Sequence, residues 1–158
     1  MNIEPYDGTK FQNLDNKVVL GNGIFIRMEN GEELLYRSVF SEKALSVFKI
    51  KRENGNLTLD FQSKISIDSG ADNILQDEEG NLWVVGHPST FKFLRHASNK
   101  DNLAPTQVFK INGKTKEVQT MYSNDGSEIS AGSTALPIGK QIYISQVFED
   151  FLLTCTKP

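Results

Sequence analysis

Three short polar side chains interrupt otherwise apolar stretches of this 158-residue chain. Asn22 lies in the segment "GNGIFI", and the pair Asp72-Asn73 opens the apolar stretch "DNIL". Asp and Asn are among the poorest strand formers, so their position at the start of a strand needs a reason. One reason is that their side-chain oxygens are the ligands that a hard cation such as Ca²⁺ takes. The other is that both segments are plain turns, which the same residue types favour.

A histidine stands at the end of the next apolar stretch, "LWVVGHP", as residue 87. An imidazole at a strand end can orient a substrate or share a proton near neutral pH, so His87 is the candidate catalytic residue. The alternative is a histidine that only makes a structural hydrogen bond. We expect His96 to be a surface or structural residue. Ser133, in "AGST", lacks the Gly-x-Ser-x-Gly elbow of a hydrolase nucleophile and is not expected to act as one.

The elements that must position these residues are short and rich in β-formers. Segments such as "GIFIR", "LTLDF" and "QIYISQVF" alternate apolar and polar residues, which is typical of half-buried strands. The segment at residues 90–102 is a weak helix candidate, partly loop. Tight turns are indicated between the strands, and the pairs that mark them are Asn30-Gly31, Asn54-Gly55, Gly80-Asn81, Asn112-Gly113 and Asp125-Gly126. The chain is therefore predicted to be all-β and built of consecutive hairpins.

The strands also repeat as a coarse unit. Counted from Asn22 to Asn73 and on to Ser133, the period is about 50 to 60 residues, near the size of a β-propeller blade with insertions. We predict a partial β-propeller over residues 1–158, a single domain of about three four-stranded blades, the last without its fourth strand. A β-sandwich would give a similar series of hairpins and is the alternative. In a sandwich, Asn22 and Asp72 would lie far apart.

Composition excludes several other classes of protein. The net charge is −3, from 17 basic and 20 acidic residues, so there is no basic surface for nucleic acid. The polar opening "MNIEPYDGTKFQ" is not a signal peptide, and no apolar run is long enough to span a membrane. The one cysteine, Cys155, cannot form a disulfide within the chain, which leaves a free thiol or a bridge to another chain.

The motifs resemble the C-terminal half of the calcium-dependent paraoxonase/arylesterase family, six-bladed propellers of the SMP-30/gluconolactonase-like superfamily. The matching stretches run in family order over nearly the whole chain: "YDGTKF…LGNGI", "GADNILQDEEGNLWVVGHP", "FLRHASNKDNLAPTQVFKI" and "NDGSEISAGSTAL…QIYISQVFEDFLLTC". The resemblance implies that Asn22, Asp72 and Asn73 are calcium ligands and that His87 lines the active-site pocket. Cys155 falls near the family's C-terminal cysteine, whose N-terminal disulfide partner this chain lacks.

The resemblance also implies an activity, the calcium-dependent hydrolysis of aryl esters or lactones as small-molecule substrates. The family's remaining calcium ligands, a Glu and an Asn, and its proposed His pair belong to the N-terminal half and have no counterpart here. We therefore expect weak calcium binding and a truncated or fragmentary member of the family. The alternative is a non-catalytic half-propeller, a binding or structural module that closes its ring as a homodimer. Compartment is not indicated, since full-length relatives are often secreted or membrane-anchored.

Overall fold

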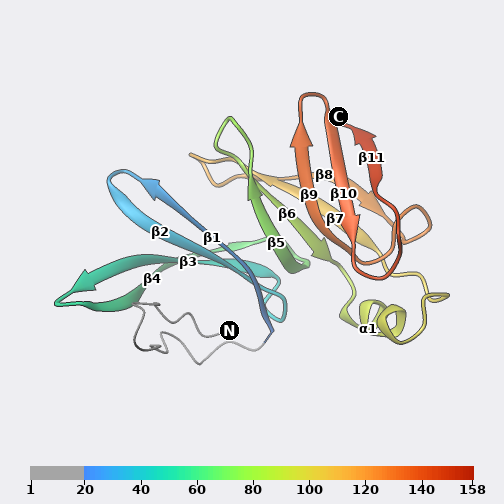
Figure 1. Ribbon diagram of the computed structural model, residues 1–158, viewed down its shortest axis with the longest axis horizontal. Helices are drawn as coiled ribbons and strands as arrows, with labels where there is room; N and C mark the ends of the chain where they lie inside the picture. Colours follow the sequence, from blue (N-terminus) through green and yellow to red (C-terminus); the bar gives the residue numbers. More distant parts are fainter. Residues whose placement is uncertain (1–19) are drawn as a thin grey trace.

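The computed structural model describes residues 20–158, which form three antiparallel sheets in chain order (Figure 1). The first sheet contains β1 (Gly21–Glu29), β2 (Glu32–Val39), β3 (Ala44–Glu53) and β4 (Asn56–Ser66). The second contains β5 (Gly70–Gln76), β6 (Leu82–His87), β7 (Thr106–Ile111) and β8 (Val118–Asn124). The third contains β9 (Gly132–Ile138), β10 (Gln141–Gln146) and β11 (Leu153–Thr156). A short helix, α1 (Thr90–Ser98), connects β6 to β7.

Each sheet pairs strands that follow one another in sequence, and short connections join them except between β6 and β7, where α1 intervenes. Asn30-Gly31 and Asn54-Gly55 have the positive φ angles of a two-residue hairpin, 50° and 80° in the first pair and 51° and 77° in the second. Asn112-Gly113 is different, because the left-handed residue of its turn is Lys116. There the Asn112 side chain accepts hydrogen bonds from the backbone of Lys114 and Thr115, both at 2.9 Å.

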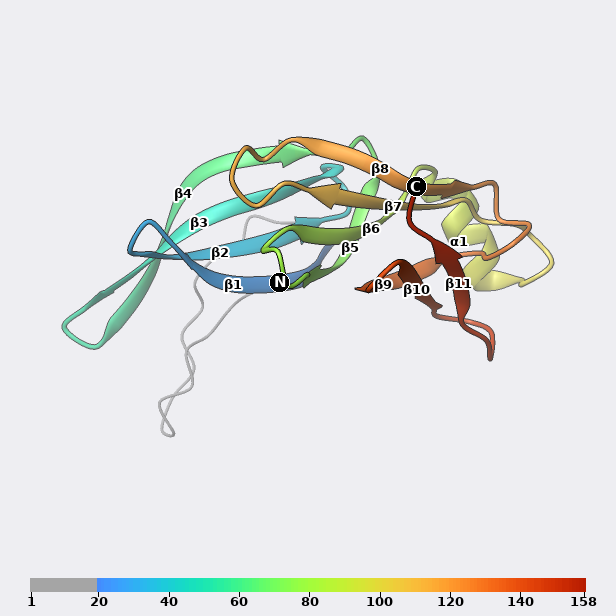
Figure 2. The same cartoon turned by 90° about the horizontal axis from the view of Figure 1, so that it is seen from above.

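The first strands of the three sheets lie side by side. β1 contacts β5, and β5 contacts β9, so one strand from every sheet meets along a common seam (Figure 2). Three consecutive meanders that meet through their first strands are consistent with blades of a partial propeller. The predicted all-β partial propeller is confirmed, and within residues 20–158 the third sheet has three strands, one fewer than the other two. The number of blades in a closed ring stays a prediction.

Two apolar clusters fill the spaces between neighbouring sheets. The first lies between the first and second sheets and contains Tyr36, Leu45, Val47, Ile65, Ile67, Ala71, Ile74, Leu82, Val84, Phe109 and Ile111. The second lies between the second and third sheets and contains Trp83, Val85, Val108, Ile129, Ala135, Ile142 and Ile144. Trp83 is 1% exposed and packs between the second and third sheets. Alternating residues of β6 therefore serve both clusters, which explains why every residue of this strand is buried.

A polar cluster joins the first two sheets at the end away from α1. Arg27 of β1 donates to the carbonyl oxygens of Gly80 at 2.6 Å and Gly113 at 3.1 Å, both in the second sheet's turns. Lys116 donates to Glu29 at 2.7 Å and to the Tyr36 hydroxyl at 2.9 Å. Burial raises the pKa of Glu29, but the hydrogen bonds from Lys116, Tyr36 and Arg27 outweigh it and leave that pKa below its ordinary value.

Candidate metal centre

The first strand of each sheet carries a β-bulge at the same end. In β1, Asn22 and Gly23 together oppose the single residue Ser38 of β2. In β5, Asp72 and Asn73 likewise oppose Val85 alone. A bulge leaves backbone groups unpaired and redirects side chains, which is why strands tolerate poor strand formers there. Asp72 and Asn73 are thus inside β5, two residues after its start, and the expectation that they begin the strand was wrong.

The bulge of the third sheet falls on Ser133. Thr134 pairs with Ser145 and Gly132 with Gln146, so Ser133 is the extra residue. The three bulges therefore occur at the residues from which the repeat was counted. This agreement indicates that the three sheets repeat one structural unit. Each sheet has one irregular segment, and that segment lies at the seam.

Gly23 brings the first two bulges into direct contact. A Cβ atom built on Gly23 would lie 2.8 Å from the Asn73 Cα and 2.8 Å from the Asp72 backbone oxygen. Such distances exclude every residue but glycine. The structure thus brings Asn22, which precedes Gly23, to the Asp72-Asn73 pair across 50 residues of sequence. The β-sandwich alternative required these residues to lie far apart and is not supported.

Asp72 and His87 form a buried pair. The His87 Nε2 atom lies 3.3 Å from the Asp72 Oδ2 atom, and the two side chains are 1% and 7% exposed. Because an ionised carboxylate only accepts hydrogen bonds, the proton lies on His87 Nε2 whenever Asp72 is charged. Within residues 20–158, the Asp72 carboxylate accepts no hydrogen bond from any other side chain, so its Oδ1 atom has no side-chain donor there.

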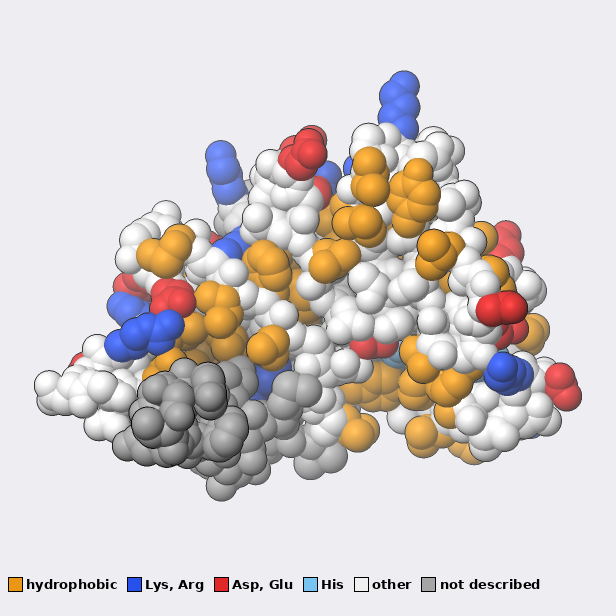
Figure 3. Space-filling view, in the orientation of Figure 1, with side chains coloured by type: hydrophobic (Ala, Val, Ile, Leu, Met, Phe, Trp, Pro, Cys, Tyr) orange, Lys and Arg blue, Asp and Glu red, His pale blue; other side chains and the backbone are white. Residues whose placement is uncertain are grey.

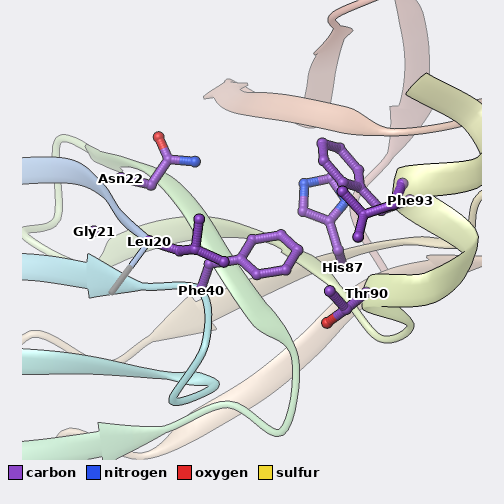
Figure 4. A pocket seen from close by; sticks show the side chains of 8 residues that line it. Leu20, Gly21, Asn22, Phe40, His87, Thr90 and Phe93 are labelled. Atoms are coloured by element: carbon purple, nitrogen blue, oxygen red, sulfur yellow. The ribbon is translucent and has the colours of Figure 1, made fainter. Parts of the chain in front are cut away.

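An apolar pocket of about 200 Å³ opens beside His87. Figure 4 shows Phe40 between the Leu20–Asn22 segment and His87, with Phe93 of α1 on the far side of the imidazole. The ring centroids of Phe40 and Phe93 lie 5.4 and 4.4 Å from that of His87. The pocket therefore has apolar walls, and the polar groups at its edge are Asn22, His87 and Thr90.

The surface around the pocket is also apolar. Leu20, Phe91 and Leu94 have exposed fractions of 59%, 69% and 59%. Hydrophobic side chains gather on the lower side of the molecule in Figure 3, toward the position of α1 in Figure 1. Ser89 caps this helix by accepting the Lys92 backbone N–H at 3.3 Å. A helix that is partly loop was predicted over residues 90–102. The helix ends at Ser98, and the rest of that segment is loop.

The donor set at the bulges of β1 and β5 suits a hard cation. Asp72 offers a carboxylate oxygen, while Asn22 and Asn73 each offer an amide oxygen, and calcium takes such ligands along with water. The Asp72 carboxylate is 7% exposed, and within residues 20–158 one of its oxygens accepts no side-chain hydrogen bond, which suits a cation ligand. No group of three His, Cys, Asp or Glu residues that could hold a metal occurs within residues 20–158. A cation at this place would need the amide oxygens of Asn22 and Asn73 beside the Asp72 carboxylate.

The remaining singled-out residues have structural places. His96 is buried rather than at the surface, and its Nδ1 atom donates to the Asn102 carbonyl oxygen at 2.7 Å. Asp77 is a turn carboxylate that accepts a hydrogen bond from Trp83 Nε1 at 2.8 Å. Cys155 is a free, half-buried thiol in β11. The Ser133 hydroxyl accepts a hydrogen bond from Asn73, a contact that the sequence around Ser133 did not indicate.

The chain was also compared with known proteins. It is similar to mechanosensory abnormality protein 6 of Caenorhabditis elegans, with 22% identity over 150 residues. The match covers 90% of this chain and 39% of that relative, so the chain spans about two-fifths of its length. Within the described part of the chain, no helix has the length and apolar character needed to cross a membrane. The family described as Arylesterase matches residues 1–156. The chain therefore belongs to the arylesterase family.

Proposed function

We propose that this chain contributes the calcium site and part of the pocket of a calcium-dependent hydrolase of aryl esters or lactones. One observation carries the proposal: the Asn22-Gly23 bulge sits directly on the Asp72-Asn73 bulge, and Asp72 is paired with His87 beside an apolar pocket. The arylesterase family supports hydrolase chemistry. The ligands Asn22, Asp72 and Asn73 come from two sheets, so the site exists only where the sheets are docked.

Each of the named residues has a distinct part in this proposal. Asn22, Asp72 and Asn73 supply oxygens to the ion, and the chemistry that bound calcium provides is stabilisation of the oxyanion formed when water attacks an ester carbonyl. The Nε2–H group of His87 donates a hydrogen bond to Asp72, and this hydrogen bond fixes the orientation of the carboxylate. Phe40 and Phe93 hold the imidazole and offer an apolar wall to the aryl or acyl group.

The test is calcium binding and ester hydrolysis by the purified 158-residue chain. Calcium binding is measured by isothermal titration calorimetry, and phenyl acetate turnover is followed with excess calcium and again with chelator. We expect binding that Asp72→Asn abolishes and chelator-sensitive turnover that it also removes. Asp68→Asn is the matched control, because Asp68 is an exposed carboxylate four residues away. A wild-type chain that neither binds calcium nor shows chelator-sensitive turnover contradicts the proposal.

A second candidate function is a non-catalytic module that pairs with another copy. Phe25 and Ala135 face the apolar clusters, so their neighbours in β1 and β9 lie on the opposite faces of the first and third sheets. These opposite faces carry exposed apolar residues, namely Ile24, Ile26 and Met28 on one sheet and Leu136, Ile138 and Tyr143 on the other. Such faces favour association between copies.

Light scattering distinguishes the two candidates. Calcium binding without turnover, in a particle with the mass of two chains, supports the module. Ile26→Lys is then expected to return the particle to the mass of one chain, because it places a charge in the interface. A monomer with chelator-sensitive turnover supports the hydrolase instead.

A further inference from the structure

The third sheet holds the side-chain amide of Asn73. The Asn73 Nδ2 atom lies 2.9 Å from the Ser133 hydroxyl oxygen, 3.2 Å from the Thr134 hydroxyl oxygen and 3.3 Å from the Ser133 carbonyl oxygen. A carbonyl oxygen only accepts hydrogen bonds, so the amide must present its NH₂ group to β9. The amide oxygen of Asn73 then points away from β9.

We propose that Ser133 and Thr134 are positioning residues that fix the Asn73 amide with its oxygen available to a bound cation. The inference rests on the proposed function, since it concerns the same ion site. The terminal torsion of an Asn side chain is soft, so an amide without partners would populate both orientations. The flipped orientation would direct the NH₂ group, with its positive hydrogens, at the cation and remove one ligand.

The bulge on Ser133 explains how β9 reaches the amide. As the extra residue of the strand, Ser133 has no cross-strand partner in β10, which leaves its carbonyl oxygen and hydroxyl free to meet β5. Thr134 follows in the regular ladder and adds the second hydroxyl. The third sheet thus contributes acceptors at the position where the other two sheets contribute ligands.

Luminescence of bound Tb³⁺ tests this part played by β9. Tb³⁺ is a hard cation that takes oxygen ligands as Ca²⁺ does, and its lifetimes in H₂O and D₂O count the water molecules on the ion. In the full chain, Ser133→Ala combined with Thr134→Val is expected to weaken Tb³⁺ binding roughly tenfold. The bound ion is expected to gain about one water molecule, because water replaces a lost oxygen ligand.

Two further variants separate positioning from packing. Thr154→Val is the matched control, because Thr154 is an exposed residue of the same sheet, and it should change neither quantity. Thr134→Ser keeps the hydroxyl, so Ser133→Ala with Thr134→Ser should recover most of the affinity lost with Thr134→Val. The variant Ser133→Ala alone, which removes a single oxygen, provides the same readout if the double variant does not fold.

The outcomes distinguish this inference from the proposed function. A wild-type chain that binds no Tb³⁺ overturns both. A wild-type chain that binds Tb³⁺, with variants that lower only the melting temperature and leave the water count and affinity unchanged, overturns the positioning of Asn73 and leaves the ion site intact. Weaker binding together with an added water molecule supports the inference.

Discussion

The backbones of Gly23 in β1 and Asn73 in β5 are in direct contact. A Cβ atom on Gly23 would lie only 2.8 Å from the Asn73 Cα, so there is no room for a side chain. The contact belongs to two bulges that oppose each other across the seam of the first two sheets. It holds Asn22 and Asp72 at one place, so the geometry of the candidate metal centre depends on a residue without a side chain.

Gly23→Ala is predicted to destabilise the chain and to abolish cation binding. The added methyl group must push β1 away from β5, and such overpacking costs about 1–3 kcal/mol. Urea unfolding measures the stability, and Tb³⁺ luminescence measures the binding. Gly31→Ala is the informative comparison, because nothing lies within 4 Å of Gly31, whose φ is 80°. It should cost stability through backbone strain while leaving cation binding unchanged; equal effects of both variants on binding would contradict the prediction.

His87→Phe is predicted to destabilise the cation-free chain. The substitution keeps an aromatic ring between Phe40 and Phe93 but leaves the Asp72 carboxylate buried without its hydrogen-bond donor. An unsatisfied buried acceptor costs about 1–3 kcal/mol. Urea unfolding in chelator gives the cost, and a double-mutant cycle with Asp72→Asn gives the coupling between the two side chains. Additive effects in that cycle would show that the 3.3 Å pair contributes nothing to stability.

The carboxylate of Asp77 is predicted to make stability sensitive to acid. Burial raises the pKa of Asp77, but hydrogen bonds from Trp83 and Asn81 outweigh it, so the folded-state pKa lies below the ordinary value of 3.8. A lowered folded-state pKa stabilises the chain above the unfolded-state pKa, and this stabilisation is lost as the pH falls through the folded-state pKa. Wild-type unfolding free energy should therefore fall more steeply below about pH 4 than that of Asp77→Asn.

The Asp77 comparison is measured by urea unfolding between pH 7 and pH 3, with Trp83 fluorescence as the signal. Asp68→Asn serves as the control, because the Asp68 carboxylate is exposed and accepts a hydrogen bond from the exposed Ser66 at 3.3 Å. Its pH profile should follow that of the wild-type chain. Parallel profiles for wild type and Asp77→Asn would be the contrary result.

Lys116→Met is predicted to loosen the first two sheets from each other. Lys116 neutralises Glu29, whose side chain is 19% exposed, and donates to the Tyr36 hydroxyl. Loss of the cation leaves Glu29 and Tyr36 with one fewer partner each, at an expected cost of about 1–3 kcal/mol. Lys51→Met, which removes an exposed ion pair with Asp60, should leave the urea midpoint unchanged. Indistinguishable midpoints for the two variants would show that the partly buried cluster is as dispensable as the surface pair.

Much of the fold could be predicted from the sequence, because alternation and Asn-Gly turns are local signals. Hairpins between neighbouring strands follow from such signals, and so does the repeat. The bulges could not be predicted, because one inserted residue shifts the register without changing the residue types around it. Asp72 and Asn73 consequently looked like a strand start, although β5 begins at Gly70.

The candidate site shows the same division. Asn22, Asp72, Asn73 and His87 stood out by residue type and by resemblance, and the structure brings them together at the seam. Ser133 did not stand out, because a serine hydroxyl has no distinctive pattern and its contact with Asn73 spans 60 residues. Of the two places expected for His96, surface or structural, the structure shows the second, a buried imidazole bonded to the Asn102 carbonyl oxygen.

The meeting of three first strands at one seam has a consequence for the order of folding. Each sheet pairs neighbours in sequence, and all of these pairs except β6 with β7 are joined by short loops, which close quickly at little entropic cost. The contacts at the seam join residues 50 to 60 positions apart, such as Asn73 and Ser133, and must form after the hairpins. Cation binding should therefore report the last event of folding. In stopped-flow refolding, Tb³⁺ luminescence is expected to lag behind the far-ultraviolet circular dichroism of the strands.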